Sequence, residues 1–140
     1  MSANKVLKLM KDKGVEYLDL RFTDPRGKLQ HLTMDGTLVD ESMLSDGVFF
    51  DGSSIAGWKA INESDMILKP DLDRLVFDPF TSHNTLVLFC DVLDAVKKNP
   101  YERDPRSIAK KAEAYLKKTG IGDKAYFGPE AEFFVFDDVK

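Results

Sequence analysis

The segment VEYLDLRFTDPRGKLQHLTM, residues Val15–Met34, has the pattern of a β-hairpin. Its first part, Val15–Thr23, is rich in β-branched and aromatic residues, which favour strands. The tetrapeptide Asp24–Gly27 places a proline at the second position and a glycine at the last position of a turn. Lys28–Met34 then returns as the partner strand. We therefore expect two antiparallel strands joined by a tight turn.

The residues on both sides of this hairpin predict a small α+β domain. Before the hairpin, apolar residues at helical spacing favour a short helix that ends at Gly14. After it, Thr37–Asp46 favours a brief helical turn. Three further strands are predicted, at Ser64–Leu68, Leu75–Phe77 and Thr85–Leu93. Five strands with one or two small helices indicate a mixed sheet, although the pattern alone leaves the connections between strands open.

A second domain is predicted to follow a boundary at Lys97–Tyr101, which is polar and ends in Asn-Pro-Tyr. Asp104 stands where a helix N-cap should be, and a proline follows at the first helical position. The next segment, Ala125–Phe136, has the pattern of a buried strand. We therefore expect one domain at residues 1–102, and the first helix and strand of another at residues 103–140.

Composition excludes several classes of protein. The chain has 140 residues, 43% of them hydrophobic and 31% charged, which is enough for one compact domain of ordinary size. The net charge of −4 is modest and the basic residues are scattered, so we expect no nucleic-acid partner. No apolar run suits a membrane span or a signal peptide, so we expect a cytoplasmic protein. The single cysteine, Cys90, is expected to be a packed thiol and not a nucleophile.

The first candidate site lies within Phe49–Leu68, which is FFDGSSIAGWKAINESDMIL. Asp51, Ser53 and Ser54 place one carboxylate beside two hydroxyls. Because Asp, Gly and Ser favour turns, a surface turn is the ordinary interpretation. The segment Gly52–Lys59 partly matches a phosphate-binding loop. A tryptophan intrudes before the lysine, however, and an alanine stands where a hydroxyl should follow, so we exclude a P-loop.

The second candidate site is the pair Glu130 and Glu132. In an extended strand both side chains point to the same face, separated by about 6–7 Å of rise. That spacing suits two neighbouring hard cations, one for each carboxylate, better than a single shared ion. Two ionised carboxylates at the start of a buried strand need cationic partners or must take up protons, and metal ions are the simplest partners. The alternative is that both simply face solvent, and the residues alone do not exclude it.

Together these segments resemble the amino-terminal portion of glutamine synthetase, the bacterial class I glutamate–ammonia ligase. The family is several times longer, so the chain is expected to be a fragment with part of the active centre, inactive alone. The resemblance implies that the first domain is a β-grasp and that the second begins the catalytic domain. Four segments carry it: Phe50–Ser54 followed by Glu63–Asp65, Leu18–Lys28, Arg103–Leu116 and Phe127–Asp138.

The family makes glutamine from glutamate, ammonia and ATP through a γ-glutamyl phosphate. By resemblance, Asp51 attracts ammonium and accepts its proton, while Ser54, and to a lesser extent Ser53, supply hydroxyls to the ammonium pocket. Glu132 is expected to bind a divalent ion near the glutamate and ammonium sites. Glu130 is expected to bind the ion near the nucleotide phosphates. The resemblance therefore implies two Mg²⁺ or Mn²⁺ ions.

The resemblance also implies a homo-oligomer, a dodecamer, with active sites between adjacent subunits. Asp51 and the glutamate pair of one chain then belong to different active sites. Trp58 is open to two interpretations, core packing or a subunit interface. Ala131 departs from the proline usual in the family, which should loosen the backbone between the two glutamates. Two alternative functions remain: a non-catalytic β-grasp module for protein contacts, and a related ligase that joins glutamate to another amine.

Overall fold

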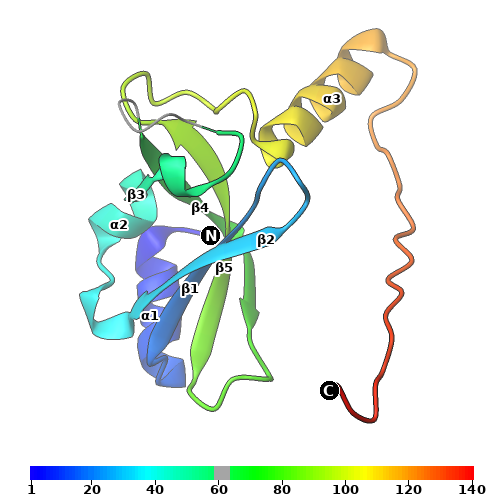
Figure 1. The fold of residues 1–140 in the computed structure, drawn as a ribbon. Coiled ribbons are helices and arrows are strands. Elements are labelled where there is room, and N and C mark those ends of the chain that lie inside the picture. The colour runs from blue at the N-terminus through cyan, green and yellow to red at the C-terminus, as the bar shows by residue number, and fades with distance from the viewer. Residues whose placement is uncertain (59–63) are drawn as a thin grey trace. The chain divides into compact units, whose positions relative to one another are not determined.

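The computed structural model describes residues 1–58 and 64–140, and its centre is a mixed β-sheet (Figure 1). The chain divides into two units, Met1–Lys110 and Lys111–Lys140. Among the described residues the sheet has 5 strands in the order β2-β1-β5-β4-β3. The strands are β1 (Tyr17–Thr23), β2 (Leu29–Asp35), β3 (Val48–Asp51), β4 (Asp65–Phe77) and β5 (Thr85–Asp94).

The predicted hairpin is confirmed. β1 and β2 pair antiparallel from Tyr17 opposite Asp35 to Thr23 opposite Leu29. The Asp24 carboxylate holds the turn, because it accepts hydrogen bonds from two backbone amides, each at 2.9 Å, and from a glutamine side chain. β1 also pairs parallel with β5, whereas the other neighbours are antiparallel. The mixed sheet expected from the sequence is therefore present.

Two details of the sheet differ from the expectation. The strands predicted at Ser64–Leu68 and Leu75–Phe77 are one strand, β4, with a shift of register between Pro70 and Leu75. Proline has no N–H to donate to a neighbouring strand, and an irregularity at this point is its usual consequence. The short edge strand β3 was not predicted, and it pairs with the first residues of β4.

The helices lie where capping residues favour them. Helix α1 (Ala3–Lys13) ends at a glycine in the left-handed conformation, as expected. The predicted helical turn after the hairpin is a 3-10 turn, η1 (Gly36–Leu38), followed by α2 (Glu41–Asp46). Helices α1 and α2 lie against one face of the sheet (Figure 1). Helix α3 (Pro105–Thr119) begins directly after Asp104, the predicted N-cap.

The core forms between these two helices and the sheet. It includes Leu18, Leu20, Leu68, Leu86 and Leu88, none of which has exposed surface. Cys90 is also buried there, which confirms the packed thiol, and burial raises its pKa. Trp58 packs against the rings of Phe22, Phe50 and Tyr101, so this part of the chain supports its core interpretation. No helix within the described residues is long and apolar enough to cross a membrane.

The strand predicted at Ala125–Phe136 is wrong for the chain as it stands. After α3, residues 121–140 form neither helix nor strand. The apolar side chains that were expected to be buried are open to solvent, with Phe133, Phe134 and Val135 82–86% exposed. A strand is held by hydrogen bonds to its neighbours, and no described strand pairs with these residues. The apolar side chains of this segment are therefore not part of a described sheet.

Candidate functional site

Asp51 is the last residue of the edge strand β3, and the chain leaves the sheet directly after it. It caps the 3-10 turn η2 (Gly52–Ser54), because its carboxylate accepts hydrogen bonds from Ser53 N at 2.8 Å and Ser53 Oγ at 2.6 Å. Asp65, which begins β4, lies directly opposite Asp51 in the β3–β4 register. The Asp51 side chain is exposed. A carboxylate so placed is ready for a cation that arrives from outside.

The electrostatics of the turn keep this carboxylate charged. The hydroxyl of Ser53, and then its backbone amide, hold the pKa of Asp51 below its usual value, and the hydroxyls of Ser54 and Ser64 act in the same direction. Hydrogen bonds to the ionised form favour that form. Near neutral pH the group is therefore a carboxylate, whose negative charge can attract a cation.

The backbone of this turn approaches β4 closely. Gly52 N donates to Ser64 O at 2.7 Å, and a Cβ added to Gly52 would lie 2.3 Å from Met66 Sδ. Met66 has no exposed surface, so its side chain would have to shift within the core to make room. Only glycine allows the turn to lie this close to β4. Glycine is favoured at position 57 for a different reason. The backbone φ there is +88°, in the left-handed region that glycine adopts readily.

The structure brings together the first set of predicted site residues. Asp51, Ser53 and Ser54 lie within one turn, and the hydroxyls of both serines affect the same carboxylate. Sequence reasoning missed Ser64, whose hydroxyl lowers the pKa of Asp51 and whose carbonyl oxygen holds Gly52. Only the pairing of β3 with β4 reveals that role, because nothing in the residue types indicates it. Residues 59–63, which include Lys59 and Glu63 of the sequence patterns above, lie outside the described residues.

Glu130 and Glu132 lie in the exposed segment after α3. The part of the chain that the structure describes shows no ion pair for either carboxylate, and no cluster of three or more metal-binding side chains. Further along the same segment, the rings of Phe134 and Phe136 are 6.2 Å apart, so alternate side chains share a side there. The same-face arrangement of the two glutamates remains a prediction.

The two glutamates fit a divalent ion in donor type but not in number. Carboxylate oxygens are the ligands that Mg²⁺ and Mn²⁺ prefer, and neither glutamate is neutralised by a cation among the described residues. An octahedral ion needs about six oxygens, which two side chains do not supply. The pair can therefore form part of a metal site and needs ligands from elsewhere.

A second polar cluster, on the other face of the sheet from α1, is satisfied internally. Asp19 accepts hydrogen bonds from His31 and Thr33, at 2.9 and 2.7 Å, and from Arg21 at 2.7 Å. Burial raises the pKa of Asp19, but hydrogen bonds from Thr33, His31 and Arg21 offset this, so the pKa lies below its usual value. These residues line a shallow pocket of about 390 Å³. The hydrogen bonds from His31 and Thr33 of β2 to Asp19 of β1 connect the two strands. We therefore assign the cluster a structural role.

Comparison with known proteins places this chain within one family. The family model described as "Glutamine synthetase, beta-Grasp domain" matches residues 14–95, and that described as "Glutamine synthetase, catalytic domain" matches residues 102–140. A glutamine synthetase of Rhizobium meliloti is 65% identical over 139 residues, which are 99% of this chain and 30% of that protein. A glutamine synthetase of Methylococcus capsulatus is 58% identical over 140 residues, again 30% of its length.

A solved structure of a glutamine synthetase has a similar fold. The electron cryomicroscopy structure of Plasmodium falciparum glutamine synthetase matches with a TM-score of 0.79 and 26% sequence identity. The match covers 89% of this chain and 24% of that chain. The β-grasp expected for the first domain is thus supported by both the family model and the fold.

Proposed function

Because the chain belongs to the glutamine synthetase family and spans about 30% of the length of the curated relatives it matches, we propose that it is the amino-terminal part of an ATP-dependent glutamate–ammonia ligase. The observation that carries the proposal is the exposed, ionised Asp51 at the end of β3, with two serine hydroxyls beside it. The family models support a division near residue 102, between a β-grasp domain and the start of a catalytic domain.

The proposed reaction has two steps with different demands. An oxygen of the glutamate side-chain carboxylate first attacks the γ-phosphorus of ATP, which releases ADP and leaves a γ-glutamyl phosphate. Ammonia then attacks the acyl carbon, and the carbon–oxygen bond to phosphate breaks to give glutamine. The nucleophile must be neutral, yet ammonia in neutral water is mostly ammonium. The Asp51 carboxylate attracts the cation and accepts the proton that it must lose.

The hydroxyls beside Asp51 complete this proposed ammonium site. Ser54, exposed next to the carboxylate, offers an oxygen that can accept a hydrogen bond from an ammonium ion. Ser53 Oγ donates to Asp51 and contributes chiefly by fixing the carboxylate. The ammonium ion would thus be bound by oxygens from one short turn.

Glu130 and Glu132 are the proposed metal ligands of the chain. Two Mg²⁺ or Mn²⁺ ions, when bound, would offset charge on the phosphate oxygens of ATP and on the glutamate carboxylate. Glu130 would hold the ion at the nucleotide and Glu132 the ion at the glutamate and ammonium sites. Both carboxylates are exposed in this chain. They are therefore available to a site that needs further ligands.

We further propose that the enzyme is a cytoplasmic homo-oligomer, a dodecamer, with active sites between adjacent subunits. Asp51 is exposed, and among the described residues its carboxylate is hydrogen-bonded only by nearby serines of the same chain, Ser53, Ser54 and Ser64. It is therefore free to reach a neighbouring subunit, and the Glu130 and Glu132 pair of the same chain would serve another active site.

Purified full-length protein tests the proposal directly, by measuring ATP-dependent glutamine formation from glutamate and ammonium. Glu132→Gln should raise the Mg²⁺ or Mn²⁺ concentration for half-maximal binding, measured by calorimetric titration, by about tenfold or more. Glu113→Gln, on the exposed face of α3, is the matched control and should leave the titration unchanged.

The outcomes separate the alternatives. Absence of glutamine formation by the wild-type protein would favour a non-catalytic β-grasp module. Product formation with another amine but not with ammonia would favour a related ligase. An unchanged metal titration in Glu132→Gln would remove that residue from the ligand set.

A further inference from the structure

The loop that carries Asp51, residues 51–58, is a series of tight turns. Ile55 N donates to Gly52 O at 3.1 Å, and Trp58 N donates to Ile55 O at 3.2 Å. The next acceptor, Trp58 O, receives the hydroxyl of Tyr101 at 3.1 Å. The Asp51 loop is therefore connected to Tyr101 by consecutive hydrogen bonds, although 43 residues separate Trp58 from Tyr101 in the chain.

Tyr101 is itself fixed to the sheet. Its backbone N donates to Val92 O of β5 at 2.9 Å, and its carbonyl accepts from Asp104 N at 3.2 Å. Its ring packs edge-on against Trp58, with centroids 5.8 Å apart and planes at 74°. Only 8% of the residue is exposed. The hydroxyl therefore holds the end of the Asp51 loop from a rigid position.

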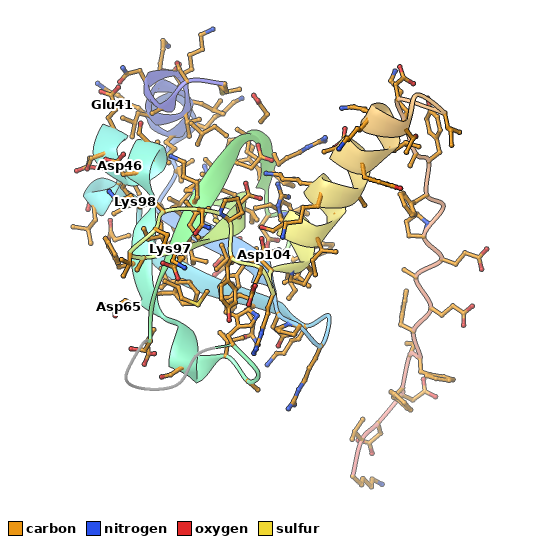
Figure 2. The ribbon with its side chains drawn as sticks, turned by 90° about the horizontal axis from the view of Figure 1, so that it is seen from above. Glu41, Asp46, Asp65, Lys97, Lys98 and Asp104 are labelled. Atoms are coloured by element: carbon orange, nitrogen blue, oxygen red, sulfur yellow. The ribbon has the colours of Figure 1, made fainter. Side chains whose placement is uncertain are left out.

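Arg103 makes a second attachment at the same end of the loop. Its Nη1 donates to Gly57 O at 3.0 Å. The residue after it, Asp104, is completely buried where α3 begins (Figure 2). Asp104 accepts hydrogen bonds from Ser107 N and Oγ, so the backbone beside Arg103 is fixed. Arg103 thus holds the carbonyl group of Gly57, and Tyr101, two residues earlier in the chain, holds that of Trp58.

We propose that Tyr101 and Arg103 are positioning residues that determine where Asp51 stands for ammonium. The inference rests on the proposed function. The other end of the loop is held by β3, a 4-residue strand that pairs, within the described sheet, with β4 alone. Such a strand needs support from the loop that follows it. Loss of the two attachments lets the turns shift together, and a small displacement of a reacting group has a large kinetic effect.

The test is steady-state kinetics on the full-length protein with Tyr101→Phe, Arg103→Ala and the double variant. We expect the KM for ammonium to rise about tenfold in the double variant, while the KM values for ATP and glutamate stay within about twofold. Arg103→Lys, which keeps a cationic donor, should restore much of the ammonium affinity. Tyr115→Phe and Arg74→Ala, both exposed and outside the loop, are matched controls.

A merely structural role predicts another pattern, in which the KM values for all three substrates change together with the melting temperature. That pattern, or an unchanged KM for ammonium, would overturn the proposal. If Tyr101→Phe fails to fold, Arg103→Ala still tests the proposal, because Arg103 is exposed. The KM for ammonium is then expected to rise about threefold. A wild-type protein that forms no glutamine would instead contradict the proposed function.

Discussion

At the scale of single residues, Asp51 is an exposed carboxylate whose pKa is lowered, among the described residues, by hydrogen bonds and not by a cation. The hydroxyl and amide of Ser53 lower its pKa. A carboxylate whose pKa is lower in the folded than in the unfolded state stabilises the fold above the unfolded value, about 3.9, and loses this effect as the pH falls through the folded value. From pH 5 upward Asp51 therefore stays charged. Pronounced pH dependence of glutamine formation near neutrality must then have another source, such as the ammonium ion.

The residue types of this site were visible in the sequence, but their surroundings were not. Asp51, Ser53 and Ser54 were selected because a carboxylate and hydroxyls suit an ammonium ion, and one turn does bring them together. The close approach of Gly52 to Met66 of the same chain becomes apparent only from the register of β3 and β4.

Gly52→Ala tests this close approach. The added methyl group would meet the buried Met66 side chain and the Ser64 carbonyl oxygen, and overpacking of this kind costs about 1–3 kcal/mol. Gly128→Ala is the control, since a Cβ there meets nothing within 4 Å. Denaturant titration of the chain should show a lower midpoint for Gly52→Ala only. Equal midpoints in the two variants would mean that β4 yields to the methyl group.

At the scale of elements, local signals identified the helices and most strands. The turn residues Asp24–Gly27 and the cap at Asp104 act on their near neighbours in sequence, so the pattern was sufficient to predict them. The edge strand β3 depends on pairing with β4, and Ala125–Phe136 depends on neighbours that the described residues do not supply. Hydrophobic pattern reports the tendency to form a strand and not the presence of its partner.

Asp104→Ala should destabilise the chain more than the loss of an ordinary cap. Besides Ser107 N and Oγ, the buried Asp104 carboxylate accepts from Val92 N of β5, so its removal leaves buried donors without a partner. We expect a loss of about 2–3 kcal/mol by denaturant titration. Asp40→Ala removes the exposed cap of α2 and should cost only about 1 kcal/mol. A cost for Asp104→Ala no greater than that of Asp40→Ala would contradict this role.

At the scale of the whole molecule, the chain carries parts of two proposed sites. Asp51 belongs to the unit Met1–Lys110, and Glu130 and Glu132 belong to the unit Lys111–Lys140. The strand pattern could not supply the β-grasp topology, which was predicted from resemblance to the family. The prediction that Asp51 of one chain acts with the glutamates of another came from the same resemblance. The family assignment is supported by both matching models.

Mixed assemblies of two inactive variants test whether neighbouring subunits share an active site. If Asp51 of one subunit serves the glutamates of another, co-assembled Asp51→Asn and Glu132→Gln full-length chains form some sites with both residues intact. Random equal mixing should restore about a quarter of wild-type activity, because each intact residue is present with a chance of about one half. Activity no higher than that of the separate variants would mean that each chain completes its own site.

The most direct test of the account is Asp51→Asn in the full-length protein, with both partial reactions measured. Asparagine keeps the size of the side chain but neither attracts a cation nor accepts a proton. Formation of the γ-glutamyl phosphate should therefore remain close to wild type, while glutamine formation from ammonium should fall by about 100-fold or more. Equal loss of both partial reactions would contradict the assignment of Asp51 as the residue that accepts the ammonium proton.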